Sequence, residues 1–408
     1  MGIQGLSEYL KKRTKCYVKK HLSQYSYKTF AVDISVFLYK TIRSRGEKDW
    51  IFGIIGIVLC LRRYKIKPIF IFDGPNFPKE KIEEREERRS SSKKVKEKAE
   101  NIKQLLETAK KKVQNNEKFS VNFRNEIYEM CKKQSKSEKF DTFDFRDRNE
   151  TIKVLESTYD KFSKQCISIE QKHVNIVKDF LQCCGIPFIQ ADGEAEALCS
   201  ILCIENKVDA VLTEDTDVLA YGSPVFLSGL DLKTETVNEV LFQNVLIELD
   251  LSKSQFLDFC IMCQCDYNKR IKIKTNGTKN SGIGPVKAML LIKKHNNIEG
   301  VDYSTDYDTT PLKYNRCREI FTMKLDINYS MDYTFVDFEK IKLFLTEHNC
   351  LFFLDQIHNI LKPPKLIFIN ETEESIDCID SSIPVEETIY IEKKVTHKRL
   401  LPSKPFKS

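Results

Sequence analysis

Three short runs of β-branched and aromatic residues, each ending on aspartate, constrain the fold of this chain more than any other feature. They lie at residues 28–33 (KTFAVD), 67–73 (KPIFIFD) and 208–217 (VDAVLTEDTD). Their apolar residues are continuous rather than alternating, which indicates strands that are buried on both faces. Strands of this kind form parallel sheets that helices cover on both sides. The sequence therefore predicts an α/β fold with a central, mostly parallel sheet.

The segments between these runs carry the helices that a parallel sheet needs for its crossovers. Residues 50–64 and 169–183 are amphipathic stretches of suitable length. The longest apolar run, residues 51–61, is too short to span a bilayer and contains two glycines. The opening residues contain no apolar secretory segment, so the 14 cysteines are expected to be reduced thiols. We expect a soluble intracellular protein with no membrane segment.

Size and charge leave the partner of the chain open. With 408 residues, of which 41% are hydrophobic, it can bury one large core or two smaller ones. The formal net charge of +7 suits a polyanionic partner, although a charge of this size is equally typical of ordinary soluble proteins.

A segment dense in Lys, Glu, Ser and Asn, residues 79–163, separates the two parts that carry the predicted strands. Its apolar residues recur at alternating spacings of four and three, which predicts one striped helix: Val95, Ala99, Ile102, Leu106, Ala109 and Val113. From the spacing alone, a solvated surface helix or a short coiled coil is the better interpretation. The composition divides the chain into an N-terminal region, a charged spacer, an internal region, a helical region and a mobile tail: residues 1–90, 91–165, 166–270, 271–362 and 363–408.

Three cysteines raise the question of a zinc site, because Cys260, Cys263 and Cys265 include a C-x-x-C pattern. The chain has no second pair at a suitable distance, and its six histidines are scattered. The surrounding segment, residues 256–267, also fits one buried helix in which cysteine serves as a small apolar residue. We favour the buried helix over structural zinc.

Seven acidic residues lie at or near the ends of the predicted elements: Asp33, Asp73, Glu194, Glu196, Asp215, Asp217 and Asp266. Four of them follow predicted strands, where open parallel sheets bind ligands. One such aspartate is more often a helix N-cap, but three strands with an E-A-E pair are hard to explain as caps. Carboxylates on one edge repel one another unless cations lie between them. Oxygen ligands without His or Cys favour Mg²⁺ or Mn²⁺, and two such ions can hydrolyse a phosphodiester.

A glycine turn gives a second kind of evidence. Gly282 and Gly284 precede Pro285, a residue favoured at the first position of a helix. Free N–H groups at a helix start can bind phosphate. A basic loop comes before this turn: Lys269, Arg270, Lys272, Lys274 and Lys279. Alone, an ordinary turn explains the pattern equally well, but beside a carboxylate edge DNA gripping is the better interpretation.

The chain resembles the flap endonuclease and XPG-type family of structure-specific nucleases. The matching motifs are MGIQGL at 1–6, AVDIS at 31–35, KPIFIFDG at 67–74, REERR at 85–89, GIP at 185–187, EAEA at 194–197, TEDTD at 213–217, CDY at 265–267 and GIGP at 282–285. They cover residues 1–90 and 169–300, with a looser likeness to residue 361. The resemblance implies a PIN-like, resolvase-like nuclease core, a helical arch formed by the spacer, and a helix-two-turn-helix region that grips DNA.

The resemblance also implies a role for each matched residue. One Mg²⁺ would be held by Asp33, Asp73, Glu194 and Glu196, and a second by Glu196, Asp215, Asp217 and Asp266, with Mn²⁺ able to substitute. Lys79, with Lys81 as the alternative, and Arg85 would contact the scissile phosphate at the foot of the arch. Tyr39 would stack on a nucleotide, and Gly2 would lie close to the site. Lys269, Lys272, Gly282 and Gly284 would contact DNA, with K⁺ at the 282–285 hairpin.

Three departures from the family pattern limit these assignments. Gln264-Cys265 stands where the family usually has Gly-Ser, which puts a close backbone approach there in doubt. The spacer is longer than in a standard flap endonuclease, so the substrate preference stays open. No sliding-clamp peptide is found, because the nearest pair, Phe352-Phe353, lies inside a helical pattern. The Lys-, Ile- and Asn-rich usage suggests an AT-rich genome, such as that of a large DNA virus.

The resemblance implies a Mg²⁺-dependent endonuclease that hydrolyses DNA at 5′ flaps or single-strand/duplex junctions during replication, repair or recombination. We expect a monomer that binds branched or flapped DNA in the nucleus (the host nucleus if the chain is viral) or, alternatively, in the cytoplasm. A 5′→3′ exonuclease or a four-way-junction resolvase on the same scaffold remains an alternative. So do a non-catalytic DNA-structure-binding protein and a Mg²⁺ phosphatase of small molecules, although the basic glycine turn speaks against the phosphatase.

Overall fold

The structure is a computed structural model of the chain. It describes residues 2–132, 145, 147–166, 169–273, 283–304, 307–325 and 327–362. The chain divides into one compact unit, Met1–Ile360, and a second unit, Leu361–Ser408. All of the second unit after Lys362, and with it the predicted tail, lies outside the described residues.

A seven-stranded sheet forms the centre of the first unit, with the strand order β1-β7-β6-β5-β2-β3-β4. The middle strand β2 (Thr29–Asp33) pairs in parallel with both β3 (Lys67–Phe72) and β5 (Ala210–Leu212). The three predicted strands are therefore neighbours, and the predicted α/β fold is confirmed. Strands β4 (Phe188–Gln190) and β6 (Val225–Asp231) extend the parallel pairing on the two sides. The sequence pattern did not predict the antiparallel edge formed by β7 (Thr236–Leu241) and β1 (Val18–His21).

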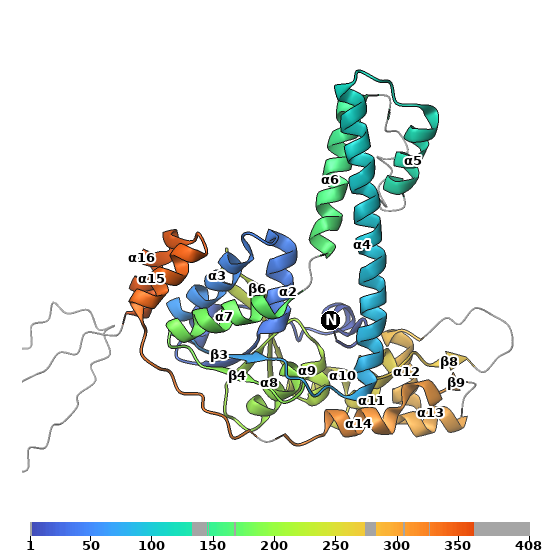
Figure 1. Ribbon diagram of the computed structural model, residues 1–408. Coiled ribbons are helices and arrows are strands. Elements are labelled where there is room, and N and C mark those ends of the chain that lie inside the picture. Colours follow the sequence, from blue (N-terminus) through green and yellow to red (C-terminus); the bar gives the residue numbers. More distant parts are fainter. Residues whose placement is uncertain are drawn as a thin grey trace, which may run out of the picture. The chain divides into compact units, whose positions relative to one another are not determined.

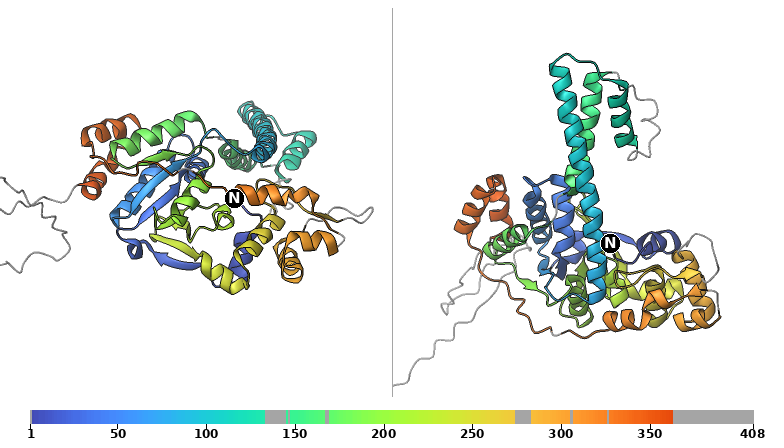
Figure 2. Two further views of the ribbon diagram at one scale, coloured as in Figure 1. Left: turned by 90° about the horizontal axis from the view of Figure 1, so that it is seen from below. Right: turned by 45° about the vertical axis from the view of Figure 1, so that its right-hand side comes forward.

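Helices cover both faces of this sheet (Figures 1 and 2). Helices α3 (Trp50–Arg63) and α7 (Gln171–Cys183) lie where crossover helices were predicted, and α2 (Ile34–Arg45) lies on the same face (Figure 1). The other face carries α8 (Ala195–Ile204), α9 (Asp217–Tyr221) and α10 (Phe242–Leu249). Apolar residues from both sequence halves, among them Leu6, Ala31, Ile71 and Leu198, belong to one core. The N-terminal and internal regions are thus two parts of a single folding unit.

The charged spacer folds into a helical hairpin of its own. Helix α4 (Lys79–Gln114) packs its apolar stripe against α6 (Arg148–Cys166), and α5 (Val121–Lys132) completes a small core. An ion pair of 2.8 Å between Lys110 and Glu156 also joins α4 to α6. The expectation of a solvated helix is wrong, because the stripe is covered, and the coiled-coil alternative is closer. Helix α4 also runs unbroken through residue 90, where the sequence suggested a boundary.

Most of the remaining elements follow β7, the last strand of the sheet. Helix α11 (Lys253–Cys263) is buried, as predicted for the cysteine-rich segment. Helix α12 (Pro285–His295) begins at Pro285, also as predicted. The other elements are α1 (Leu6–Arg13), β8 (Lys272–Ile273), α13 (Ile298–Ser304), β9 (Tyr307–Asp308), α14 (Tyr314–Phe321), α15 (Phe338–Glu347), α16 (Leu354–Leu361) and short 3-10 turns at Leu22–Tyr25, Thr310–Leu312 and Leu351–Phe353. Among the described residues, no helix has the length and apolarity to cross a bilayer.

Candidate metal centre and nucleic-acid interface

Four of the predicted aspartates lie at one edge of the sheet because parallel strands end there together. Strand β2 ends at Asp33, β3 ends one residue before Asp73, and Asp215 and Asp217 follow β5. Hydroxyl groups hold the first two carboxylates in place. Thr213 Oγ1 donates to Asp33 Oδ2 at 2.9 Å, and Ser35 Oγ donates to Asp73 Oδ2 at 2.7 Å. The side chains of Asp33 and Asp73 are therefore oriented before any ligand binds.

The other three predicted carboxylates meet around one lysine from the first turns of α4, residues 79–89, here called the foot of α4. Glu194 caps α8, Glu196 lies in its first turn, and Asp266 follows α11. The Lys81 ammonium lies 2.9 Å from Glu196 Oε1 and 3.5 Å from Asp266 Oδ2, and it also pairs with Glu194. The structure thus brings together all seven predicted residues, here called the carboxylate cluster: Asp33, Asp73, Glu194, Glu196, Asp215, Asp217 and Asp266.

Burial and mutual repulsion dominate the electrostatics of the carboxylate cluster. Burial, followed by the charge of neighbouring carboxylates, raises the pKa of Glu194 to about 8 and that of Asp215 to about 7. The same causes raise the pKa of Asp33 and of Asp217 well above the usual range. Burial alone would also raise the pKa of Glu196, but Lys81 lowers it overall. Without further cations, the cluster therefore holds protons at neutral pH.

Asp217 tests whether this cluster suits a metal ion. Its carboxylate is fully buried, and within the described part of the chain neither oxygen has a hydrogen-bond partner. A buried carboxylate without donors is costly unless a cation or a proton compensates it. Among the described residues, no three side chains already converge as a closed metal site. The donor set, all carboxylate oxygen, fits Mg²⁺ or Mn²⁺.

The two basic residues predicted at the foot of α4 do not point to the carboxylate cluster. Lys79 is the exposed first residue of the helix, whereas Lys81 lies among the carboxylates. Arg85 is exposed, and its guanidinium lies 4.0 Å from the centre of the Phe77 ring. Arg88 contacts the carboxylate cluster where Arg85 was expected to, because it lies two helical turns after Lys81 on the same face of α4. It donates to the two oxygens of Asp266 at 3.1 and 3.2 Å.

The predicted DNA-contact residues are distributed around the carboxylate cluster. Gly2 lies so close to the Asp215 carboxylate and to the backbone of Thr216 and Asp217 that a side chain would overlap them, which places the N-terminus beside the cluster. Tyr39 is exposed on α2, with the Arg43 guanidinium 4.8 Å from its ring centre. Gly284 caps α12, and a side chain there would meet open space.

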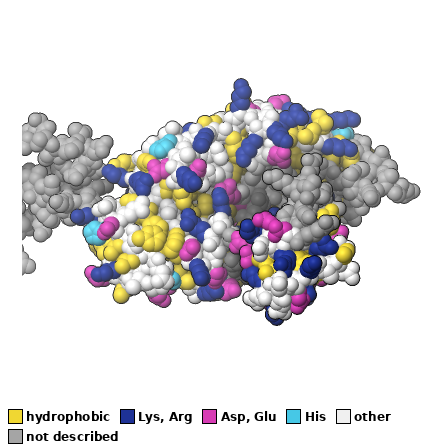
Figure 3. All heavy atoms as spheres, turned by 90° about the horizontal axis from the view of Figure 1, so that it is seen from above, with side chains coloured by type: hydrophobic (Ala, Val, Ile, Leu, Met, Phe, Trp, Pro, Cys, Tyr) yellow, Lys and Arg dark blue, Asp and Glu magenta, His cyan; other side chains and the backbone are white. Residues whose placement is uncertain are grey.

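The basic loop is described only in part. Lys269 is exposed and lies 3.9 Å from Glu83 on α4. Lys272 begins β8, but its side chain lies outside the described residues, as do Lys274, Lys279 and Gly282. In Figure 3, basic side chains surround a hollow on the face seen from above, with acidic side chains among them.

Several residues of the site were not predicted from the sequence. Tyr267 donates a hydrogen bond to Glu194, and its hydroxyl lies 3.1 Å from that of Tyr221. Ser35 and Thr213 each stand two residues from a predicted aspartate, but their hydroxyls donate to aspartates in other segments, Asp73 and Asp33, so sequence spacing does not reveal these bonds. Arg88 stands in the same R-x-x-R-R motif as Arg85, so only the rotation of α4 separates the two.

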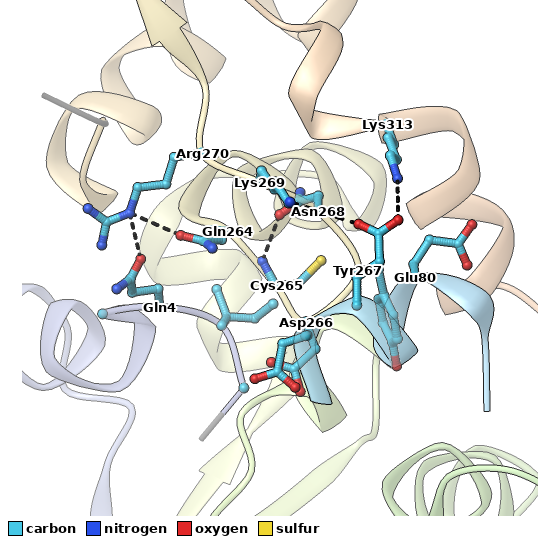
Figure 4. A pocket seen from close by; sticks show the side chains of 15 residues that line it. Gln4, Glu80, Gln264, Cys265, Asp266, Tyr267, Asn268, Lys269, Arg270 and Lys313 are labelled. Carbon is cyan, nitrogen blue, oxygen red and sulfur yellow. Dashed lines mark hydrogen bonds and ion pairs between the residues drawn. The ribbon is translucent and has the colours of Figure 1, made fainter. Parts of the chain in front are cut away.

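A cavity of about 750 Å³ opens beside the carboxylate cluster (Figure 4). Its lining includes Gln4 from the N-terminal segment, residues 264–270 after α11, and acidic residues on α4. A second cavity of about 620 Å³ has Arg85, Arg89 and Glu194 in its lining. The foot of α4 contributes residues to both, so the carboxylate cluster can be approached from two cavities.

Two family models match the chain. The XPG N-terminal domain matches residues 1–95, and the XPG I-region matches residues 185–266. All seven residues of the carboxylate cluster lie within these two segments. The segment between the two matches contains most of the helical hairpin.

Named relatives match most of the chain. A protein of Invertebrate iridescent virus 3, named "Probable RAD2-like endonuclease 076L", is 31% identical over 356 residues, which cover 81% of this chain and 87% of the relative. A "Flap endonuclease 1" from Encephalitozoon cuniculi is 28% identical over 370 residues, which cover 85% of this chain and 90% of the relative.

Solved structures share the fold. The catalytic core of Rad2 in complex with DNA substrate gives a TM-score of 0.55 at 17% identity, covering 88% of this chain and 100% of that one. Flap endonuclease-1 from Methanococcus jannaschii gives 0.51 at 22% identity, covering 85% of this chain and 96% of that one.

Proposed function

The chain belongs to the XPG and flap endonuclease family, and from this premise we propose that it is a metal-dependent nuclease that hydrolyses DNA at junctions between single and double strands. The observation that carries the proposal is the carboxylate cluster itself. Seven acidic residues from two distant parts of the sequence meet at one sheet edge, where several pKa values are raised by burial and repulsion. Such an arrangement is costly for stability, so it points to a ligand that compensates the charge.

Two Mg²⁺ ions, or Mn²⁺ in their place, fit this cluster. Asp33, Asp73, Glu194 and Glu196 would hold one ion; Glu196, Asp215, Asp217 and Asp266 would hold or orient the other. When bound, such ions supply an activated water and charge stabilisation at the leaving oxygen. The protein's own part is to fix these oxygens in advance, which Ser35, Thr213 and Tyr267 do through hydrogen bonds.

Lys81 and Arg88 supply the positive charge at the foot of α4. With no other cation present, Lys81 pairs with Glu194 and Glu196, while Arg88 pairs with Asp266. With metal ions held by those carboxylates, both cations would be available for the non-bridging oxygens of the scissile phosphate. Charge placed in advance of the reaction in this way stabilises a transition state at little reorganisation cost.

DNA would be held by groups on the elements around the cluster. The N-terminus of α12, with the open space at Gly284, suits a duplex phosphate. A K⁺ ion at the 282–285 hairpin is part of this proposal, as are stacking by Tyr39 and contacts from Lys269 and Lys272. The free 5′ end would pass the hairpin of α4 and α6. We further propose a monomer that acts in the nucleus, with the cytoplasm as the alternative.

One cleavage assay tests the proposal. Labelled 5′-flap, nicked, gapped, blunt and four-way-junction DNAs are incubated with the protein in Mg²⁺ and in EDTA. We expect Mg²⁺-dependent cleavage at the flap junction, while cutting of the four-way junction or progressive 5′ removal would favour the resolvase or the exonuclease. Binding of branched DNA with no Mg²⁺-dependent cutting would support a non-catalytic protein instead.

A matched pair of aspartate variants completes the assay. Asp215→Asn removes a cluster carboxylate after β5, whereas Asp209→Asn changes an aspartate just before β5, outside the cluster. We expect cleavage to be lost only in the first. Equal cleavage by both variants would show that the chemistry lies elsewhere.

A further inference from the structure

The residue after α11 has a backbone conformation that a side chain rarely tolerates. Gln264 has φ 83° and ψ 122°, in the region that favours glycine. A non-glycine residue held there is under backbone strain, and such residues concentrate at functional sites. The residue lies two positions before Asp266 of the carboxylate cluster. The side chain of Gln264 therefore needs a reason to be present where glycine would be easier.

Two other residues hold this glutamine in place. The Gln264 carbonyl accepts the backbone N–H of Gln4 at 2.9 Å. Arg270 Nε lies 3.0 Å from Gln264 Oε1 and 3.0 Å from Gln4 Oε1, so one N–H group is shared by two amide oxygens (Figure 4). These three residues, here called the amide–guanidinium array, connect the N-terminal segment to the loop after α11.

The hydrogen-bonding pattern leaves the array rich in donors. Both amide oxygens face Arg270 Nε, which leaves the two amide NH₂ groups as donors. The terminal guanidinium nitrogens of Arg270 have no partner within the described part of the chain and add four more N–H groups. All three side chains line the 750 Å³ cavity beside Asp266. A group of donors without an acceptor suits an anion.

The position of the array relates it to the predicted DNA grip. Gly5, the neighbour of Gln4, lies against the first residue of α12, because a side chain there would come within 3.0 Å of Pro285. The array thus lies between the carboxylate cluster and the helix start that suits a duplex phosphate. A DNA strand that runs from one to the other would place a phosphate near Arg270.

We propose that Gln4, Gln264 and Arg270 together bind one phosphate of the DNA strand, distinct from the phosphate that is cut. This inference rests on the proposed function for the identity of the ligand as DNA. Gln264 acts through its side chain, and the strained backbone directs that side chain toward the cavity. The Gly-Ser that the family usually has at these positions would lack the amide, so the site distinguishes this chain from that pattern.

The test combines protein variants with single neutral phosphates in the DNA. Flap DNAs carry one methylphosphonate at successive positions on each side of the junction, and binding to the full-length protein is measured in EDTA, which prevents cleavage. For the wild type, a methylphosphonate at one non-scissile position should weaken binding by about tenfold, which is the usual contribution of a hydrogen bond to a charged group. For Arg270→Gln and Gln264→Gly, natural DNA should bind more weakly, and the methylphosphonate at that position should weaken binding less than it does for the wild type.

Lys313→Gln is the matched control, because it removes one positive charge from the lining of the same cavity without touching the array. It should weaken binding to natural DNA while the methylphosphonate at the sensitive position keeps its full effect. Circular dichroism melting confirms that each variant is folded; we expect Gln264→Gly to melt no lower than the wild type, since it relieves backbone strain.

The inference is overturned if Arg270→Gln retains the full methylphosphonate effect at every position while DNA binding is otherwise normal. That result would leave the proposed nuclease function intact. A wild type that binds none of the DNAs would overturn both proposals.

Discussion

The two halves of α4 lie in opposite surroundings, although they belong to one continuous helix. The upper half, residues 95–113, buries an apolar stripe against α6. The foot buries the charge of Lys81 among three carboxylates and places Arg88 beside Asp266. Apolar packing stabilises the first arrangement, whereas the second brings buried charge together at a cost in stability. The upper half therefore has a structural role, and the foot a role that only a bound ligand explains.

The largest expected effect concerns the foot. Lys81→Ala should lower the cleavage rate by about 10²–10³-fold, the usual loss when a preorganised charged donor is removed. The matched variant Lys79→Ala removes an exposed lysine two residues away and should change the rate little. Single-turnover kinetics at saturating enzyme measures both, and equal losses would refute the assignment of Lys81.

A substitution in the upper half of α4 should lower the local stability of the helical hairpin. Ile102 is fully buried between α4 and α6, so Ile102→Ala should cost about 2–5 kcal/mol of local stability. Hydrogen exchange of α4 and α6 should then speed up without a matching change in the sheet. Glu107→Ala, an exposed position on the same helix, is the control. If exchange in the hairpin is unchanged by Ile102→Ala, the small core does not hold it together.

The pH dependence of protein stability should come mainly from the carboxylate cluster at the foot of α4 and the sheet edge. Raised folded-state pKa values, about 8 for Glu194 and about 7 for Asp215, mean that the folded protein binds more protons than the unfolded chain above pH ~4. In EDTA, this contribution to stability is complete below pH ~4 and is lost as pH rises through 7 to 8. Glu196, whose pKa is lowered, opposes the trend in part.

Melting temperatures in EDTA should accordingly be lower at pH 8 than at pH 5.5. Mg²⁺ should raise the melting temperature more at pH 8, where the cluster is deprotonated and ready to bind cations. A melting temperature in EDTA that rises over this interval would contradict the burial of ionisable carboxylates at the site.

The smallest effect separates two arginines of the foot. Arg88→Ala should reduce cleavage by about twofold to fivefold more than Arg85→Ala, since half-exposed charge pairs are worth up to about 1 kcal/mol. Arg85 lies over Phe77 and lines the second cavity, so its loss should affect binding of DNA before it affects the rate. A dominant effect of Arg85 on the rate would reverse the assignment.

The same contrast explains what could be predicted from the sequence. The spacing of apolar residues and the runs of β-branched and aromatic residues predicted β2, β3, β5 and the apolar stripe of α4. These elements could be predicted because the burial of apolar side chains is encoded in local sequence patterns. They could not predict which of Lys79 and Lys81 enters the site, since that depends on where α4 begins after Pro78 and on its rotation. The sheet edge was predictable for Asp33 and Asp73 because strands that end together bring their last residues together.

Other parts of the site depend on contacts between distant segments. Gln264 is held by hydrogen bonds with Gln4 and Arg270. No sequence pattern indicates that these three residues are in contact. The antiparallel pairing of β7 with β6 and with β1 was not predicted, because β7 and the N-terminal strand β1 carry weaker patterns than the central strands. Tyr267 belongs to the CDY motif, but its hydrogen bond to Glu194 depends on the tertiary fold and could not be predicted from that motif.

The central claim, that the carboxylate cluster binds divalent cations, is tested most directly by calorimetric titration of the full-length protein with Mg²⁺ or Mn²⁺. Asp217, whose buried oxygens have no hydrogen-bond partner among the described residues, is the residue to change. We predict that Asp217→Asn weakens cation binding by at least about tenfold, while Asp209→Asn binds as the wild type does. Equal cation affinity in the wild type and in Asp217→Asn would contradict the account.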